Sequence, residues 1–319
     1  MEFSLIDRIR ERTAQARDDV HLGIGDDAAL VAVPSGQELA VAIDTLVEGV
    51  HFPLGTLASD VGWKSLAVNL SDLAAMSATP AWALLAMTLP KGDSDFIDGF
   101  ATGFAQLAQP YRLALVGGDT TRGPLTISVA VHGFVPHGKA LTRAGAKPGD
   151  VIFVTGTLGD AAAGLQLLQG QRNNDARAHF LVERLNRPTP RVAAGLALRG
   201  HATACIDVSD GLLADLGHLC KASGVGAEVD ASLLPRSSAL LDLFDDTTSR
   251  DFALSGGDDY ELCFTVSSQH TATVQADLAR LGCGATKIGR IVEGGDIGVR
   301  GADGNALEQH HRGWDHFTS

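Results

Sequence analysis

Aspartates recur in short turns rich in Gly, Ser and Thr along the whole chain. Most of these turns follow or end a predicted strand, and their small residues would let the backbone approach a ligand closely. Carboxylates at strand ends converge where α/β folds place their sites, so we expect these side chains to share one site. The turns are GIGDDAAL (Asp26, Asp27), AIDTL (Asp44), NLSDL (Asp72), GGDTT (Asp119), CIDVSDG (Asp207, Asp210) and SGGDDYEL (Asp258, Asp259).

Such a set of like charges predicts bound cations, because the carboxylates would otherwise repel one another strongly. Oxygen ligands without nearby His or Cys favour Mg²⁺ over zinc, and Mg²⁺ usually completes its shell with substrate phosphates. The pattern therefore predicts a nucleotide site with several Mg²⁺ ions. For any single turn the alternative is ordinary turn and helix-capping chemistry, above all for Asp207, Ser209 and Asp210 ahead of a predicted helix.

Two segments come close to better-known phosphate-binding loops and fail in detail. GFVPHGKA has Ala140 where a P-loop needs Ser or Thr for Mg²⁺, and Pro136 interrupts the loop. GIGDDA would place two acids against a pyrophosphate, and no strand is predicted before it or helix after it. The sequence therefore predicts neither a P-loop nor a dinucleotide fold. GxSxG, HExxH and EF-hand sequences do not occur, so protease and hydrolase functions lack a positive signal.

Four other side chains are candidates for substrate contacts. Arg143 and Lys147 lie in a Gly-rich segment of an acidic protein, where they could bind phosphate or be solvated linker charges. His51, in VEGVHFP, could bind substrate or complete a turn. Trp314 lies in the polar context HHRGWDHF, so it could stack on a flat heterocycle or belong to the core.

The elements that would position these residues begin with an N-terminal mixture of helices and strands. In the helix expected from Asp60, the side chains of Ser65, Asn69 and Asp72 gather opposite the apolar face, which predicts that Asp72 points away from the local core. Strands are expected over 31–33, 39–43, 82–87, 113–116 and 126–135, and helices over 3–12, 60–77 and 94–109.

A second pattern begins after GKALTRAGAKPGD, whose Gly, Pro and charged residues are typical of a linker. Strands VIFVTG and ATACID follow, with a small-residue helix from about 160 and a helix that runs from Gly211 to a stop at Gly224. The prediction is an α/β (α+β) protein with an N-terminal domain over 1–137, a linker over 138–150 and a C-terminal α/β domain over 151–319.

Composition bounds the function classes. The 25 Lys and Arg face 38 Asp and Glu, and a formal charge of -13 argues against nucleic-acid binding. The four cysteines form no CxxC pair, which favours a reducing, cytoplasmic setting. The N-terminus does not resemble a signal peptide, and no stretch of about 18 apolar residues would span a membrane.

Taken together, a series of sequence blocks resembles the thiamine-monophosphate kinase family in both order and wording. The resemblance implies Mg²⁺-dependent transfer of the γ-phosphoryl group of ATP to thiamine monophosphate, the last step of thiamine diphosphate biosynthesis. It also implies the two-domain fold of the aminoimidazole ribonucleotide synthetase superfamily, without a P-loop, and a homodimer formed through the N-terminal sheet. The blocks are GIGDDAAL, AIDTLVEGVHF, KSLAVNLSDLAAMSATP, GGDTTRGPL, HGFVP, ALTRAGAKPGD, VTGTLGDAAAGL, RPTPR, IDVSDGLLADLGHL and SGGDDYEL.

The resemblance also implies roles for individual residues. Relatives often carry Glu where this chain has Asp258, so the carboxylate is shifted here by one methylene. Asp119, Asp210 and Arg143 are the implied catalytic residues. The implied magnesium ligands are Asp27, Asp44, Thr45, Asp72, Asp119, Asp207 and Asp210; the implied ATP contacts are Gly118, Asp119, Arg143 and Ser209; and the implied thiamine phosphate contacts are His51, Asp258 and Trp314.

The expected chemistry needs no general base, since a phosphate monoester has a second pKa of about 6 and is already anionic. We therefore expect direct transfer, with positioning and charge stabilisation as the main effects. Within the superfamily, selenophosphate synthetases carry a reactive Cys near the N-terminus, whereas the first here is Cys205, and hydrogenase-maturation relatives end in Cys, whereas this chain ends HFTS. An aminoimidazole ribonucleotide synthetase fits the blocks less well. A non-catalytic nucleotide-binding dimer is the alternative from another class.

Overall fold

The computed structural model describes residues 2–170, 175–307 and 313. The chain forms two compact units, of which the first comprises the chain up to Leu73 together with 78–138, and the second comprises 74–77 and the chain from Lys139 onward. Each unit has its own sheet and its own buried core. The domain boundaries expected from the sequence stay a prediction.

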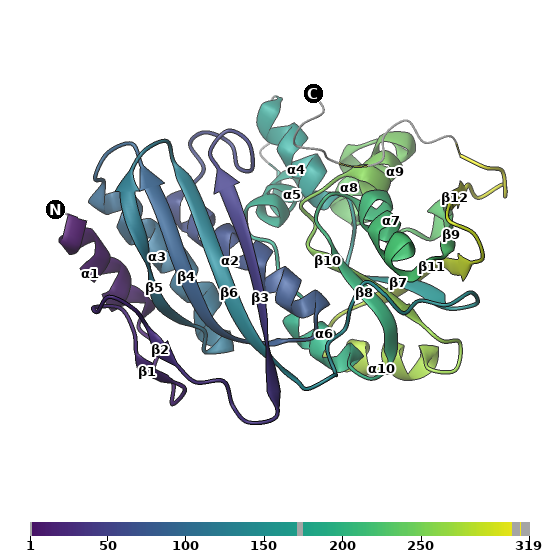
Figure 1. Ribbon diagram of the computed structural model, residues 1–319. Coiled ribbons are helices and arrows are strands. Elements are labelled where there is room, and N and C mark those ends of the chain that lie inside the picture. The colour runs from purple at the N-terminus through teal and green to yellow at the C-terminus, as the bar shows by residue number, and fades with distance from the viewer. Residues whose placement is uncertain (1, 171–174, 308–312, 314–319) are drawn as a thin grey trace. The chain divides into compact units, whose positions relative to one another are not determined.

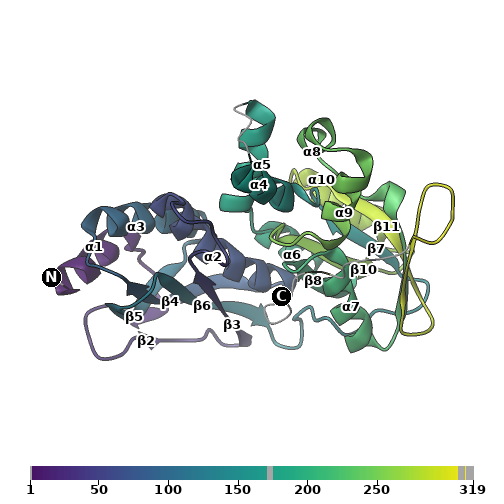
Figure 2. The same cartoon turned by 90° about the horizontal axis from the view of Figure 1, so that it is seen from above.

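The first unit is built on a four-stranded sheet in the order β3 (Gln37–Val47), β6 (Thr126–Pro136), β4 (Thr79–Leu89) and β5 (Ala114–Arg122), as Figure 1 shows. Only the β4–β5 pair within this sheet is parallel. The helices α1 (Glu2–Thr13), α2 (Ala58–Ala75) and α3 (Ser94–Ala108) lie on one face of it (Figure 2). Exposed aliphatic side chains remain elsewhere on the strands, with Val41 59% and Ile43 66% exposed on β3 and Leu84 39% exposed on β4.

Helix α2 corrects one expectation. Its predicted polar side is enclosed, since Ser65 is 1% and Asn69 0% exposed, and Asp72 is half-buried. The helix packs closely against α3, since a Cβ on Gly62 would collide with the carbonyl of Phe100 and one on Gly103 with the carbonyl of Ser59, and Asn69 contacts Asp44 of β3. Because both sides of α2 are covered, its polar residues must find partners inside the protein.

A short strand pair was not expected. β1 (Val20–Leu22) pairs antiparallel with β2 (Leu30–Val31), so a strand does precede the GIGDDA turn, against the prediction, and the chain pairs across that turn. Strands of three and two residues are too short for the alternation of apolar and polar residues to be recognised in the sequence. The other strands and helices predicted in this half are present, with most ends shifted by a few residues.

The second unit holds a six-stranded sheet in the order β12 (Ile297–Arg300), β9 (Gly226–Asp230), β11 (Ala285–Val292), β7 (Val151–Thr155), β10 (Glu261–Val266) and β8 (Ala202–Val208). The β12–β9 pair is parallel and the others are antiparallel. Its helices are α4 (Asp160–Gln169), α5 (Ala176–Asn186), α6 (Val192–Leu198), α7 (Leu212–Ser223), α8 (Ser238–Leu243), α9 (Asp246–Ser255) and α10 (Thr271–Arg280).

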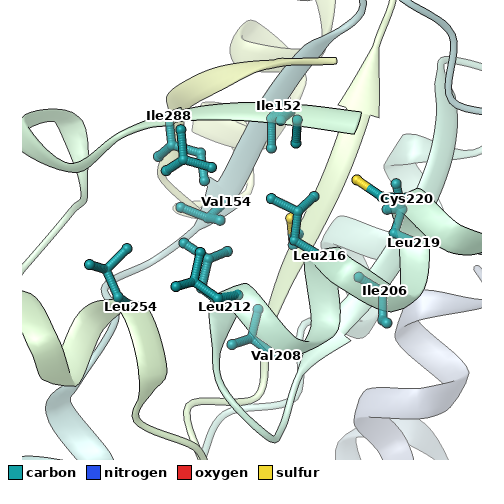
Figure 3. Packing of buried hydrophobic residues seen from close by; sticks show 14 of the residues in the cluster. Ile152, Val154, Ile206, Val208, Leu212, Leu216, Leu219, Cys220, Leu254 and Ile288 are labelled. Carbon is teal, nitrogen blue, oxygen red and sulfur yellow. The ribbon is translucent and has the colours of Figure 1, made fainter. Parts of the chain in front are cut away.

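The core of this unit lies between α7 and the sheet. Leu212 and Leu216 of α7 are fully buried in one cluster with Ile152 and Val154 of β7 and with Ile206 of β8 (Figure 3). Helix α7 ends at Gly224, which has the left-handed φ of +68° that was expected of a stop residue. The end of β8 that follows Ile206 is therefore supported by this closely packed core.

The segment 138–150 was predicted as a linker, and from Lys139 onward it belongs to the second unit. The N–H of Cys205 donates to the Thr142 carbonyl at 2.9 Å, and the N–H groups of Gly145 and Ala146 donate to Ser223 Oγ at 3.1 and 3.2 Å. These hydrogen bonds fix the backbone of the segment, although its glycines are typical of a flexible linker.

Candidate functional site

Residues predicted for the site fall in both units. Asp27, Asp44, Thr45, His51, Asp72, Gly118 and Asp119 belong to the first unit, and Arg143, Asp207, Ser209, Asp210 and Asp258 belong to the second. Trp314 lies outside the residues that the structure describes. Each set has its own geometry.

Asp44 lies on β3, half-buried, and is tied to α2. Its backbone N–H donates to Asn69 Oδ1 at 3.0 Å, and Asn69 Nδ2 donates to the Ser65 carbonyl at 2.9 Å. The next residue, Thr45, shares a hydrogen bond of 2.7 Å between its Oγ1 and Ser128 Oγ on β6. Asn69 thus fixes the strand position from which Asp44 projects. The sequence indicated it only as a polar residue within an otherwise apolar helix.

Gly118 and Asp119 lie on β5, and both are exposed. Gly118 has a φ of +154°, and a Cβ there would collide with the Leu85 carbonyl, so the position accepts only glycine. A pocket of about 50 Å³ lies beside them, lined by Ile6, Ile9, Ile24, Leu85, Leu115, Gly117, Gly118, Asp119 and Thr120. The Asp119 carboxylate is therefore exposed beside this hollow, where its oxygens are available to a hard cation.

The GIGDDA turn divides its two acids between two roles. The backbone N–H of Asp27 donates to the Asp26 carboxylate at 2.8 Å, and Gly25 takes a φ of +125°. Asp26 therefore supports the turn, while the exposed Asp27 carboxylate is presented to solvent. The assignment of Asp27 as the metal ligand of this turn stays a prediction.

His51 lies in a turn in which both its backbone and its ring are hydrogen-bonded to Val47. The Val47 N–H donates to His51 Nδ1 at 3.0 Å, and the His51 N–H returns to the Val47 carbonyl at 3.0 Å. Because Nδ1 accepts a hydrogen bond, the neutral ring carries its proton on Nε2, which can donate to a substrate oxygen. Lys64, only 2% exposed, donates from Nζ to the His51 carbonyl at 3.1 Å. Lys64 was not predicted as a site residue, and its only signal in the sequence is a lysine within a largely apolar helix.

The acids after β8 gather around the start of α7. Asp207 is 5% exposed, and the N-cap of α7 is Gly211, without a side-chain cap, so Asp207, Ser209 and Asp210 do not cap this helix. Instead Asp215 of α7 accepts the N–H groups of Ser209 and Asp210 at 3.0 and 3.1 Å. Burial, and then the charges of Asp207 and Asp210, raise the pKa of Asp215 to about 8. Acidic groups therefore gather at this strand end, and burial together with their proximity keeps a proton on Asp215 near neutral pH.

The loop between α9 and β10 joins this strand end. The N–H of Asp258 donates to the Ser209 carbonyl at 2.8 Å, and the N–H of Tyr260 donates to the Val208 carbonyl at 2.8 Å. Asp258 and Tyr260 both have left-handed backbones, with φ of 68° and 50°. The candidate substrate residue Asp258 is thus placed next to the candidate ATP residue Ser209.

Two further acids of the SGGDDYEL block are structural. Asp259, 1% exposed, accepts the Gly159 N–H at 2.7 Å at the start of α4, and burial raises its pKa to about 8. Glu261 is fully buried and pairs with Arg184 at 2.9 Å and with Arg191 at 2.5 Å. These acids hold the fold around the loop.

Arg143 is held by its backbone and presents its side chain to solvent. Ser223 Oγ donates to the Arg143 carbonyl at 3.0 Å, and the side chain is exposed. An exposed guanidinium on a fixed backbone can bind phosphate oxygens through two hydrogen bonds.

The donor chemistry of these residues fits magnesium. The candidate ligands are carboxylates and one hydroxyl, which hard cations prefer. Over 2–170, 175–307 and 313, no three His, Cys, Asp or Glu side chains come together in a metal-binding group. Mg²⁺ is usually bound through one or two carboxylates with waters and substrate phosphates, so such a group is not required. Within those same ranges, no helix is both long and apolar enough to span a bilayer.

Comparison with known proteins matches both halves of the chain to one family. Residues 25–135 match the N-terminal domain of AIR synthase related protein, and residues 147–302 match the C-terminal domain. A thiamine-monophosphate kinase of Salmonella typhimurium is 49% identical over 100% of this chain and 98% of its own length. That of Bacillus subtilis is 38% identical over 99% of both chains.

Solved structures give the same picture. A crystal structure of thiamine-monophosphate kinase from Stenotrophomonas maltophilia is 52% identical, with a TM-score of 0.89 over 96% of this chain and 98% of that one. A ThiL structure complexed with AMPPCP and TMP is 34% identical, with a TM-score of 0.79 over 99% of this chain and 97% of that one. The predicted fold class is confirmed.

Proposed function

The chain belongs to the AIR synthase related family and, within it, to the thiamine-monophosphate kinases, and from this membership we propose its function. It is an ATP-dependent kinase that phosphorylates thiamine monophosphate to thiamine diphosphate. The observation that carries this conclusion is the full-length similarity to such kinases, among them a structure that holds the ATP analogue AMPPCP together with TMP.

Magnesium is proposed as the metal of the reaction. When bound, Mg²⁺ would neutralise phosphate charge and so reduce the repulsion between two polyanions. The exposed Asp27 and Asp119 and the accumulation of acids around Asp215 support this choice. The residues proposed to hold it are Asp27, Asp44, Thr45, Asp72 and Asp119 in the first unit, and Asp207 and Asp210 in the second.

The protein groups proposed to act on the phosphates are donors and not bases. Gly118, where the close Leu85 carbonyl excludes any side chain, is proposed to contact ATP through its backbone. Arg143 and Ser209 donate to ATP oxygens, and His51 donates from Nε2 to the acceptor phosphate. The acceptor oxygen is already anionic near neutral pH, because the second pKa of a phosphate monoester is about 6. We infer direct transfer without a phospho-enzyme. Trapping of a ³²P-labelled covalent intermediate would overturn this inference.

A homodimer formed through the first unit's sheet is proposed as the working assembly. Val41, Ile43 and Leu39 alternate along β3 and are exposed, and Leu84 is exposed on β4. Exposed aliphatic side chains in such a row mark an interaction surface. Sedimentation of wild-type protein beside Ile43→Asp is expected to give a dimer and a monomer respectively, and a monomeric wild type would contradict the assembly.

The setting proposed is the reducing cytoplasm. All four cysteines are buried thiols in the described part of the chain, and none forms a disulfide there.

A coupled assay tests the proposed function. Purified protein is incubated with ATP, Mg²⁺ and either thiamine monophosphate or thiamine, and an Asp119→Ala variant is run in parallel. We expect thiamine diphosphate from the monophosphate alone, and a loss of at least about a hundredfold in the variant, the size of one lost charge-stabilising group. ATP binding without turnover of any thiamine species would instead favour a binding-only role.

A further inference from the structure

Tyr260 places its hydroxyl on the Asp258 carboxylate. Tyr260 Oη donates to Asp258 Oδ1 at 2.9 Å, and Tyr260 is only 8% exposed. The packed ring gives the hydroxyl one position, so the carboxylate that it contacts is held as well.

The backbone supports the same arrangement. Asp258 and Tyr260 have φ of 68° and 50°, a conformation that side-chain-bearing residues adopt only when their surroundings impose it. Here Asp259, between them, is anchored on the Gly159 N–H, and the flanking N–H groups donate to Ser209 and Val208. Two left-handed residues flanking a buried anchor turn both side chains to the same side of the loop, where they meet.

We propose that Tyr260 is a positioning residue for substrate recognition, whose hydroxyl holds the Asp258 carboxylate so that this charge binds the ring end of thiamine monophosphate. The inference rests on the proposed function. A carboxylate repels the phosphate end of that substrate, whereas the thiazolium ring is a permanent cation and the aminopyrimidine carries N–H donors. Asp258 therefore favours binding of the ring end of thiamine monophosphate, and Tyr260 fixes the position of the carboxylate that makes this contact.

The test is a double-mutant cycle with Tyr260→Phe and Asp258→Asn. Tyr260→Phe removes one oxygen and keeps the buried ring, and Tyr111→Phe is the matched control at the only other tyrosine. We expect Tyr260→Phe to raise the KM for thiamine monophosphate roughly tenfold, the size of one hydrogen bond to a charged group. The KM for ATP and the thermal unfolding midpoint should stay close to those of Tyr111→Phe.

The cycle separates positioning from a general structural role. If Tyr260 acts through Asp258, Tyr260→Phe adds nothing further once Asp258 is Asn. Additive effects, an equal rise in the KM for ATP, or a Tyr260→Phe enzyme identical to Tyr111→Phe would overturn the inference. The wild type is assayed first, and absence of thiamine diphosphate there would instead refute the proposed function.

Discussion

Two groups of three acids in the second unit have similar composition and opposite surroundings. Asp160, Asp259 and Glu261 are fully or almost fully buried beside Arg184 and Arg191, whose guanidinium groups pair with Glu261 at 2.9 and 2.5 Å. Asp207, Asp210 and Asp215 lie at the end of β8 and the start of α7, where burial and then the negative neighbours of Asp215 raise its pKa. We call them the paired cluster and the β8 cluster.

The difference between the surroundings of the two clusters indicates a structural role for the paired cluster and a ligand-binding role for the β8 cluster. A buried acid with its own arginine completes the fold, whereas acids gathered around one another gain most from a cation supplied by a ligand. The two clusters look alike in the sequence, because DVSDG and GGDDYE both place acids in a turn that contains Gly. The arginines that distinguish them come from α5 and from the start of α6, more than 65 residues away in sequence.

The largest expected effect comes from removing the central charge of the paired cluster. Glu261→Gln leaves Arg184 and Arg191 partly buried without their shared anion, and breaking such a pair costs about 3–5 kcal/mol. The free energy of unfolding, measured in urea, should fall by this amount. A change below about 1 kcal/mol would show that the arginines do not need Glu261.

In the β8 cluster the matched change should act on activity. Asp210→Asn is expected to lower kcat by at least about a hundredfold, because a metal and phosphate ligand loses its charge. Its free energy of unfolding without Mg²⁺ should stay within about 1 kcal/mol of the wild type, since a half-buried acid among like charges adds little stability. Full activity in this variant would remove Asp210 from the reaction.

Asp259 makes the paired cluster sensitive to pH. Its pKa is raised from 3.8 to about 8 by burial, so the folded protein binds a proton that the unfolded chain has lost. The stability that this proton contributes is complete below pH 3.8 and is lost as the pH rises through about 8. The stability of wild type relative to Asp259→Asn should therefore fall between pH 5 and 8.5 in urea unfolding. A constant difference would mean that Asp259 is ionised throughout.

The smallest effect is expected at Asp215. Asn at this position keeps a carbonyl oxygen for the two N–H groups of Ser209 and Asp210. Because burial and the charges of Asp207 and Asp210 raise the pKa of Asp215 to about 8, the carboxyl that Asn replaces is mostly uncharged near neutral pH. The free energy of unfolding without metal should change by less than about 1 kcal/mol. Comparing the loss of unfolding free energy in Asp215→Asn with that in Glu261→Gln tests the contrast between the two clusters most directly. An equally large loss in both variants would contradict it.

Much of the fold could be predicted from periodicity, because α3, α7, β4 and β6 carry clear apolar patterns. The partners within the site could not. Asn69 under Asp44, Lys64 under His51 and Tyr260 against Asp258 are contacts that depend on tertiary packing or on left-handed backbone, which local propensity does not encode. The choice of candidate ligands came from resemblance and stays a prediction at the level of single residues.

The most direct test of the contrast is calorimetric titration of Mg²⁺ in the presence of AMPPCP, with wild type, the Asp207→Asn/Asp210→Asn double variant and Glu261→Asp. The account predicts fewer or weaker Mg²⁺ sites in the double variant and an unchanged number in Glu261→Asp. Equal stoichiometry and affinity in wild type and in the double variant would contradict the claim that the β8 cluster is kept for a metal.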